Sequence, residues 1–252
     1  MDPKTAVKRT VLLFIICLAI DSLILATIGI FLLRVTALIV LPCAVALSAL
    51  WIFFIYRKVD SLILKKINAK PLQTADHHRF SNLVDGVCVA YGFRHPQLYV
   101  VEDVAPNMMM IGRDSQHSSL VVTTGLLDRV QRTELEGLIT HELSRSRNRT
   151  SFLEGAIAIL VVKPWNFIPK FVSLMGDKLI DPWAVAETDI AAVALTRYPP
   201  GLAQALTNLG ADGREPTYNP KFCRHMWVNP PRESLICSGF STDERIAALA
   251  EL

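Results

Sequence analysis

The chain contains few cysteines and little net charge, and both shortages exclude classes of function. Its 252 residues include five Cys, and no two are spaced as C-x-x-C, so we find no zinc-finger or disulfide framework. Cys17 and Cys43 fall in apolar runs, and Cys88 falls on the apolar face of a predicted helix, which indicates buried thiols. The formal net charge of +3 is small and scattered, which argues against binding to nucleic acid.

Hydrophobic residues are abundant instead, at 51% of the chain, and most of the excess lies near its start. Two nearly continuous apolar runs, about 11–33 and 35–56, are each long enough to cross a bilayer, and only Arg34 separates them. A cleaved signal peptide does not fit the first run, which is too long and leads directly into another span. The sequence therefore predicts a transmembrane hairpin in a domain of residues 1–57.

Basic residues flank both outer ends of this hairpin, whereas its turn carries a single Arg. By the positive-inside rule, both ends face the cytoplasm. We therefore expect a protein integral to the plasma (inner) membrane, with both termini and the following domain cytoplasmic. The flanking basic residues are Lys4, Lys8, Arg9, Arg57, Lys58, Lys65 and Lys66.

Asp21 lies near the middle of the first span, where a carboxylate is costly. One interpretation gives it a function or a partner in another subunit. The other is a protonated or locally hydrogen-bonded Asp at the interface of the two helices. The predicted spans contain no Lys or Arg to pair with it, which leaves a partner subunit open.

The remaining residues, 58–252, mix helical and strand patterns. Apolar residues at helical spacing predict a helix over 75–91 ended by Gly92, and a longer series of helices follows Gly125. Between them we expect three short strands, at 97–101, 108–111 and 119–124. The fold class is α+β: a transmembrane hairpin followed by a mainly helical domain with a small β-sheet.

The segment 151–180 is apolar but interrupted by Pro and charged residues, and its first run is too short to span a membrane alone. We interpret it as a helical hairpin. It either lies against the membrane or is an ordinary buried hairpin, and the pattern leaves both open.

The stretch TELEGLITHELSRSRNR, residues 133–149, is the centre of the predicted domain. Thr133 followed by Glu136 indicates a capping box at a helix start. A His-Glu-x-x-His helix would hold Zn²⁺ with two imidazoles and use the Glu as general base. Here His141 and Glu142 are present, but Arg145 stands where the second His would be.

From about residue 80 to residue 252, the chain resembles HtpX-like membrane metallopeptidases of the gluzincin type, relatives of the prenyl-protein endopeptidases. The stretches that carry the resemblance are LYVVEDVAPN, VVTTGLLDRVQRTELEGLITHELSRSRNR, TDIAAVALTRYPPGLAQAL and, more weakly, HMWVNP with DERIAAL. They occur in the family's order, and two spans ahead of the domain also fit.

The resemblance implies a zinc held by both His of the motif helix and by a Glu four residues before an Asp. Asp189 matches that Asp, but Val185 stands in place of the Glu. Glu187 is close in sequence and should face away from Asp189. The family's near-terminal His-Pro is also absent, because this region reads Ser-Gly-Phe at 238–240.

A catalytic zinc needs three protein ligands, and a guanidinium cannot be one. We therefore expect His141 to be the sole remaining ligand and Glu142 a vestigial general base. No cofactor is expected, or zinc if the family function is retained with substitute ligands such as Glu187 or His225. Arg145 either replaces the metal as a cationic crosslink to Asp189 or Glu142, or points to solvent.

Ala105, Pro106 and Asn107, with the strand after them, match the family's substrate-binding edge strand, where a peptide would add as an extra strand. An ordinary sheet edge is the other interpretation.

Three hypotheses for the function follow. The first is a membrane-anchored, catalytically inactive pseudopeptidase that acts as a structural or regulatory subunit of a membrane complex, with a protein partner. The second is an active zinc-dependent endopeptidase of membrane or misfolded proteins. The third is a peptide-binding module that uses the edge strand.

Overall fold

The computed structural model describes residues 3–32, 34, 36–73, 77–114, 116–165, 167–231, 233–236 and 239–252. Several predicted features therefore lie partly outside the described residues. These are the ends of the two spans at 33 and 35, the start of the predicted helix at 75 and 76, and Ser238.

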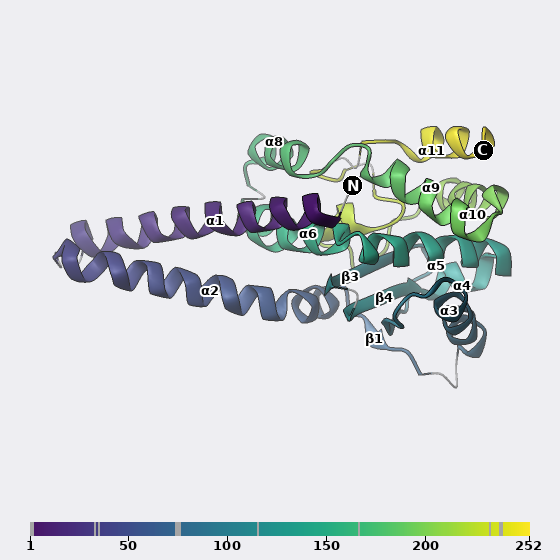
Figure 1. Ribbon diagram of the computed structural model, residues 1–252, viewed down its shortest axis with the longest axis horizontal. Coiled ribbons are helices and arrows are strands. Elements are labelled where there is room, and N and C mark those ends of the chain that lie inside the picture. Colours follow the sequence, from purple (N-terminus) through teal and green to yellow (C-terminus); the bar gives the residue numbers. More distant parts are fainter. Residues whose placement is uncertain are drawn as a thin grey trace.

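Two long helices at the start of the chain lie side by side and project from the rest of the molecule (Figure 1). The first is α1 (Pro3–Thr27), continued by a π-helical turn at Ile28–Leu32, and the second is α2 (Ala37–Lys66). Both are long and apolar enough to cross a membrane. Of the predicted spans 11–33 and 35–56, the residues 11–32 and 37–56 fall within these helices, which extend further on the side of the domain.

The base of the hairpin packs into the domain. The α2 helix passes position 57 without a break and ends at Lys66, while Tyr56 and Phe14 pack against Phe152 with ring centroids 5.6 and 6.3 Å away. The hairpin and the domain thus share one hydrophobic core, and the division into two domains at 57 and 58 stays a prediction.

A small mixed sheet forms the centre of the domain. Its strands are β1 (Lys70–Pro71), β2 (Gln97–Val101), β3 (Met108–Asp114) and β4 (His117–Thr123). Their spatial order is β1-β2-β4-β3, with β2 and β4 parallel and the other pairs antiparallel. The three predicted strands are confirmed. The sequence did not predict β1, because a strand of two residues is too short to show a strand pattern.

The consecutive residues Met108, Met109 and Met110 are fully buried. Because neighbouring residues of a strand face opposite sides, Met109 joins a cluster with α1, α2 and α6, while Met108 and Met110 join one with α3, α5 and α10. β3 therefore connects the two cores of the domain.

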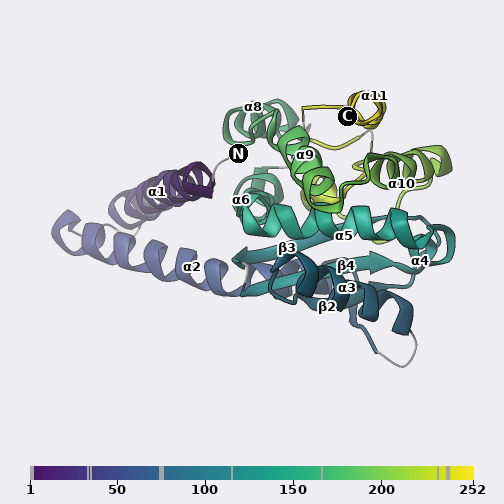
Figure 2. The same cartoon turned by 45° about the vertical axis from the view of Figure 1, so that its right-hand side comes forward.

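Helices surround the sheet, as Figure 2 shows. They are α3 (His78–Tyr91), α4 (Thr124–Arg129), α5 (Arg132–Arg147), α6 (Thr150–Ile157), α7 (Lys163–Trp165), α8 (Pro169–Leu179), α9 (Ala184–Thr196), α10 (Pro199–Asp212) and α11 (Thr242–Ala250). A π-helical turn, Ala158–Val162, continues α6, and a 3₁₀ helix spans Lys221–Met226. The predicted α+β class, with a mainly helical domain and a small sheet, is confirmed.

Gly125 does not simply end the sheet, because it lies inside α4, which the sequence pattern did not reveal. A Cβ at this position would clash with the backbone carbonyl of Val104. The glycine thus permits a close approach of two backbone segments, in addition to any role in a turn.

The segment 151–180 divides into two parts. Residues 150–162, in α6 and its π-helical extension, are all buried in the protein, whereas α8 is more exposed, and Phe167, Ile168 and Leu174 expose large apolar side chains. The buried interpretation therefore holds for the first part. Contact of the second part with a membrane stays a prediction.

Candidate functional site

The motif helix α5 begins at Arg132, one residue before the predicted start. Its capping box joins Gln131 and Glu134, not Thr133 and Glu136 as predicted. The Gln131 N–H donates to Glu134 Oε2 at 3.0 Å, and Asn208 Nδ2 donates to the same oxygen at 3.0 Å. Glu134 therefore joins the helix start to α10, an interaction across the fold that local spacing does not reveal.

α5 is buried from Gly137 to Ser146, so its polar residues lie in the core. Arg145 is enclosed there with a side chain only 6% exposed, and the solvent-facing interpretation of this residue is wrong. Its guanidinium donates from Nη1 to Glu142 Oε1 at 2.8 Å and to the carbonyl oxygen of Met226 at 3.2 Å. Its Nη2 forms an ion pair with the carboxylate of Glu154 on α6.

Glu154 is a functional residue that the sequence analysis missed. It is the one charged residue between Thr150 and Val162, and a single carboxylate in an apolar run is a signal that it has a buried partner. Arg145 is that partner, so one guanidinium joins α5 to α6 through two carboxylates.

Burial and charge act in opposite directions on these two carboxyls. Burial raises the pKa of Glu154 to about 7, although Arg145 lowers it, and the nearby Glu142 raises it further. Burial also raises the pKa of Glu142, but Arg145 and His141 outweigh it and leave that pKa below its usual value. Glu142 Oε2 is buried and has no hydrogen-bond partner among the described residues.

A second arginine occupies the other side of His141. Arg245 on α11 binds Asp189 on α9 in a bidentate pair, with Nε and Nη2 each 2.8 Å from a carboxylate oxygen. Its Nη1 donates to the carbonyl oxygen of Val228 at 2.9 Å. The predicted pairing of Arg145 with Glu142 is thus present, whereas Asp189 pairs with Arg245 instead.

Arg245 lies on the buried face of α11. It lies four residues before Leu249, and both are buried on the same face of α11. Ser241 and Glu244 form a capping box at the start of α11, with the Glu244 N–H donating to Ser241 Oγ at 3.3 Å. This cap fixes the start of the helix that carries the guanidinium.

Both ring nitrogens of His141 have close partners. Nδ1 lies 3.1 Å from Glu142 Oε1, and Nε2 lies 3.2 Å from Asp189 Oδ1 and 3.4 Å from Arg245 Nη2. His141 therefore lies between the two arginine–carboxylate clusters and links them.

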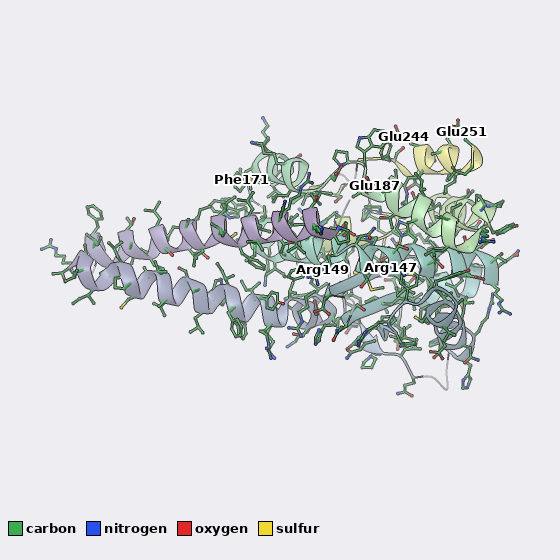
Figure 3. The ribbon with its side chains drawn as sticks, in the orientation of Figure 1. Arg147, Arg149, Phe171, Glu187, Glu244 and Glu251 are labelled. Atoms are coloured by element: carbon green, nitrogen blue, oxygen red, sulfur yellow. The ribbon has the colours of Figure 1, made fainter. Side chains whose placement is uncertain are left out.

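The remaining predicted site residues lie elsewhere. Val185 is half-buried on α9, and Glu187 is exposed on the same helix, where Figure 3 labels it. His225 is buried with Nε2 3.3 Å from the carbonyl oxygen of Glu154, and burial lowers its pKa to about 4. A neutral imidazole is thus available at His225, but it lies beside Arg145.

The zinc implied by the family does not fit these residues. The charged groups around His141 are the carboxylates of Glu142 and Asp189 and the guanidinium groups of Arg145 and Arg245. Each guanidinium is already bonded to one of these carboxylates. Burial lowers the pKa of Arg145, but Glu142 and Glu154 outweigh it and raise the pKa, so a fixed positive charge remains beside Glu142. Within the described ranges, no group of three or more His, Cys, Asp or Glu side chains is arranged to hold a metal ion.

The predicted peptide-binding edge is enclosed. Ala105, Pro106 and Asn107 are all buried, and Asn107 Nδ2 donates to the carbonyl oxygen of Asn229 at 2.8 Å. At the start of β3, the chain itself occupies the edge: the Val228 N–H donates to the Met108 carbonyl oxygen at 2.9 Å, and Met109 forms an isolated bridge with residue 227. Trp227 forms this bridge directly after Met226, the last residue of the 3₁₀ helix Lys221–Met226.

Asp21 lies on the hairpin, away from these clusters. It lines a small surface pocket of about 250 Å³ together with Ser48 and Trp51 on α2. Ser48 Oγ is buried without a hydrogen-bond partner. Each of the two helices therefore contributes a polar side chain to this pocket, Asp21 from α1 and Ser48 from α2.

Comparison with known proteins agrees with this architecture. Residues 74–167 match the model of peptidase family M48. Two relatives named Protease HtpX homolog come from Thermoanaerobacter pseudethanolicus, at 27% identity over 78% of this chain and 79% of the relative, and Dictyoglomus turgidum, at 29% identity over 78% and 77%. A third, from Dictyoglomus thermophilum, is 33% identical over 68% of this chain and 50% of its own length. No solved structure gave a significant match.

Residues 74–167 are thus similar to peptidase family M48, and two apolar helices precede them. The chain is HtpX-like, and the resemblance identified from the sequence is confirmed.

Proposed function

We propose that this chain is a membrane-anchored pseudopeptidase, in which two arginine–carboxylate clusters have replaced the zinc site. It serves as a structural or regulatory subunit of a membrane complex. The observation that carries the proposal is the guanidinium of Arg145, which lies between the carboxylates of Glu142 and Glu154 at the position of the family's second zinc ligand.

The charge balance supports this. A metallopeptidase uses the motif Glu to take a proton from a metal-bound water. Here Glu142 Oε1 accepts hydrogen bonds from Arg145 and lies beside His141. A divalent cation placed here would face the guanidinium and would have to displace its bonds, and breaking a buried ion pair costs about 3–5 kcal/mol.

The proposed role as a subunit rests on the hairpin. Most large apolar side chains of α1 and α2 are exposed, including Leu23 and Leu38, as expected for helices that contact lipid or another membrane protein. Asp21 is a polar group in the apolar span, and such groups commonly face a partner. An inner-membrane location with a cytoplasmic domain is part of this proposal.

The test is the zinc content of the full-length protein, purified in detergent and measured by elemental analysis, beside its cleavage of casein. The matched control is Glu142→Gln, which removes the general base and keeps the side-chain size. We expect no zinc and no cleavage that depends on Glu142. One zinc per chain, with cleavage lost in Glu142→Gln, would overturn the proposal.

The comparisons favour a second candidate, an active endopeptidase, because the relatives are named proteases. This function requires Arg145 to leave the site and substitute ligands to enter, and the same zinc measurement separates the two. The peptide-binding module has less support, since the start of β3 is paired with the chain's own residues 227 and 228.

A further inference from the structure

A groove of about 520 Å³ opens where the hairpin meets the domain. Its walls come from α1, α2 and the start of α6, and they are mostly apolar. Representative lining residues are Val11, Phe14, Ile15, Ile52, Phe53 and Phe152. An apolar groove between two candidate membrane spans is suited to a hydrocarbon chain.

Two arginines line the same groove. Arg113, on β3, lies over the ring of Tyr56 with its Cζ 5.8 Å from the centroid, and its Nε is buried without a hydrogen-bond partner. Arg149, between α5 and α6, is the second (Figure 3). In the described part of the chain, neither guanidinium forms an ion pair.

Among the described residues, no acidic neighbour forms a hydrogen bond or an ion pair with either guanidinium. Asp114 also lines the groove, but its carboxylate accepts from the N–H groups of Gln116 and His117 at 2.7 and 2.8 Å and lies 3.0 Å from the His117 ring. Asp60 on α2 interacts electrostatically with Arg113, yet its Oδ1 is itself without a hydrogen-bond partner. In the described part of the chain, Arg113 Nε is thus a buried donor without a hydrogen-bond partner at the polar end of the groove.

The length of α2 between its start and the groove is close to the thickness of a membrane. Tyr56 follows the first residue of α2, Ala37, by 19 residues, which is about 29 Å along a helix. This length is close to the roughly 30 Å hydrocarbon core of a bilayer. If the turn of the hairpin lies at one membrane surface, Arg113 and Arg149 lie at the other, with the acyl region beside the apolar walls.

We propose that this groove binds an anionic phospholipid, with an acyl chain along α1 and α2 and the phosphate at Arg113 and Arg149. Charge complementarity selects this occupant, because two arginines recognise a phosphate. An apolar membrane helix or a neutral lipid would leave the charge of the two arginines without a counter-charge. The site is independent of peptidase activity and of the two clusters around His141.

The experiment uses the full-length chain, incubated with vesicles of phosphatidylglycerol and phosphatidylcholine in equal parts and repurified in detergent. The retained phospholipid is extracted and quantified by headgroup. We expect retention of phosphatidylglycerol in preference to phosphatidylcholine. Equal retention of the two lipids, or displacement by inorganic phosphate alone, would overturn the proposal.

The headgroup variant is Arg113→Gln with Arg149→Gln, and we expect about tenfold less bound phosphatidylglycerol, in line with the loss of charge-assisted hydrogen bonds. Its matched control, Lys58→Gln with Lys65→Gln, removes the same charge from exposed positions of α2 outside the groove. An equal loss in the control would mean general attraction to an anionic surface and would contradict a built site.

The tail variant is Ala49→Phe, which fills the groove without changing charge, and Ala46→Phe is its control on an exposed position of α2 that does not line the groove. We expect only the first to reduce the bound lipid, and this test remains decisive if the arginine variants do not fold. Unchanged retention in Ala49→Phe, or a protein crosslinked into the groove in place of lipid, would overturn the proposal.

Discussion

Arg145 and Glu142 lie one turn apart on α5 and are joined by a hydrogen bond of 2.8 Å, at positions where a zinc peptidase would carry a metal ligand and a general base. The Glu142 carboxylate is thus bound to the Arg145 guanidinium, a cation that cannot dissociate from the protein as a metal ion can. A metal crosslink depends on metal supply, whereas this one is covalently part of the chain. Under the proposed function, this exchange keeps the fold of the motif helix and removes the requirement for zinc.

Arg145→Met should destabilise the folded protein by about 3–5 kcal/mol, because it leaves Glu142 and Glu154 buried without a cationic partner. The measurement is thermal or denaturant unfolding of the purified full-length chain. Arg132→Met is the control, since Arg132 is exposed at the start of the same helix. A variant of Arg145 as stable as this control would mean that the ion pairs contribute nothing.

The stability of the protein should depend on pH through Glu154. Burial raises its folded-state pKa from 4.5 to about 7, so between these values the folded state binds a proton that the unfolded state has released. The contribution of Glu154 to the free energy of unfolding is therefore present below about pH 4.5. It is lost as the pH rises to about 7, at about 1.4 kcal/mol per pH unit.

His225 acts in the opposite direction. Its folded-state pKa is lowered from 6.5 to about 4, so its contribution is present above about pH 6.5 and is lost as the pH falls toward 4. The two dependences nearly cancel in the wild type over the shared range. Glu154→Gln should therefore gain stability as the pH rises from 4 to 6.5, and His225→Asn should lose stability from 4.5 to 7. Two variants with the same pH profile would contradict these assignments.

The sequence predicted the parts of the fold that have a local pattern. The apolar runs gave the hairpin, the β runs gave β2, β3 and β4, and Gly92 in the left-handed conformation ends α3 as expected. The signals that failed were also local. Thr133 with Glu136 satisfies the rule for a capping box, yet Gln131 with Glu134 forms it, because Asn208 on α10 also binds Glu134.

The candidate site was predictable to the extent that its residues lie on one helix. His141, Glu142 and Arg145 share a face of α5 by their spacing. The partners Glu154 and Arg245 come from other helices, and no spacing relates Arg245 to Asp189 across 56 residues. A buried charge can be suspected from an apolar run, as at Glu154, but its partner is decided by packing.

Arg245→Lys should cost about 1–3 kcal/mol, because an ammonium group cannot reproduce the bidentate bonds to Asp189 and the third bond to the carbonyl of Val228. Arg214→Lys is a matched control, since Arg214 also binds one carboxylate, Asp212, through Nε and Nη2. The Arg214 side chain is half exposed, so its replacement should cost less than about 1 kcal/mol. Equal unfolding free energies for the two variants would contradict a special role for burial.

Removing all charge from the Arg145 cluster should restore most of the stability that Arg145→Met removes. The combined variant Arg145→Met, Glu142→Gln and Glu154→Gln has no uncompensated charge in the core, and buried ion clusters replaced as a whole are often as stable as the original. The pair Glu142→Gln with Glu154→Gln alone should be destabilised, because it leaves the guanidinium unpaired. Unfolding of the four proteins forms a cycle that measures the coupling directly. If the combined variant is less stable than Arg145→Met, the carboxylates must stabilise the core through contacts other than Arg145, and the guanidinium would not be the group that holds α5 to α6.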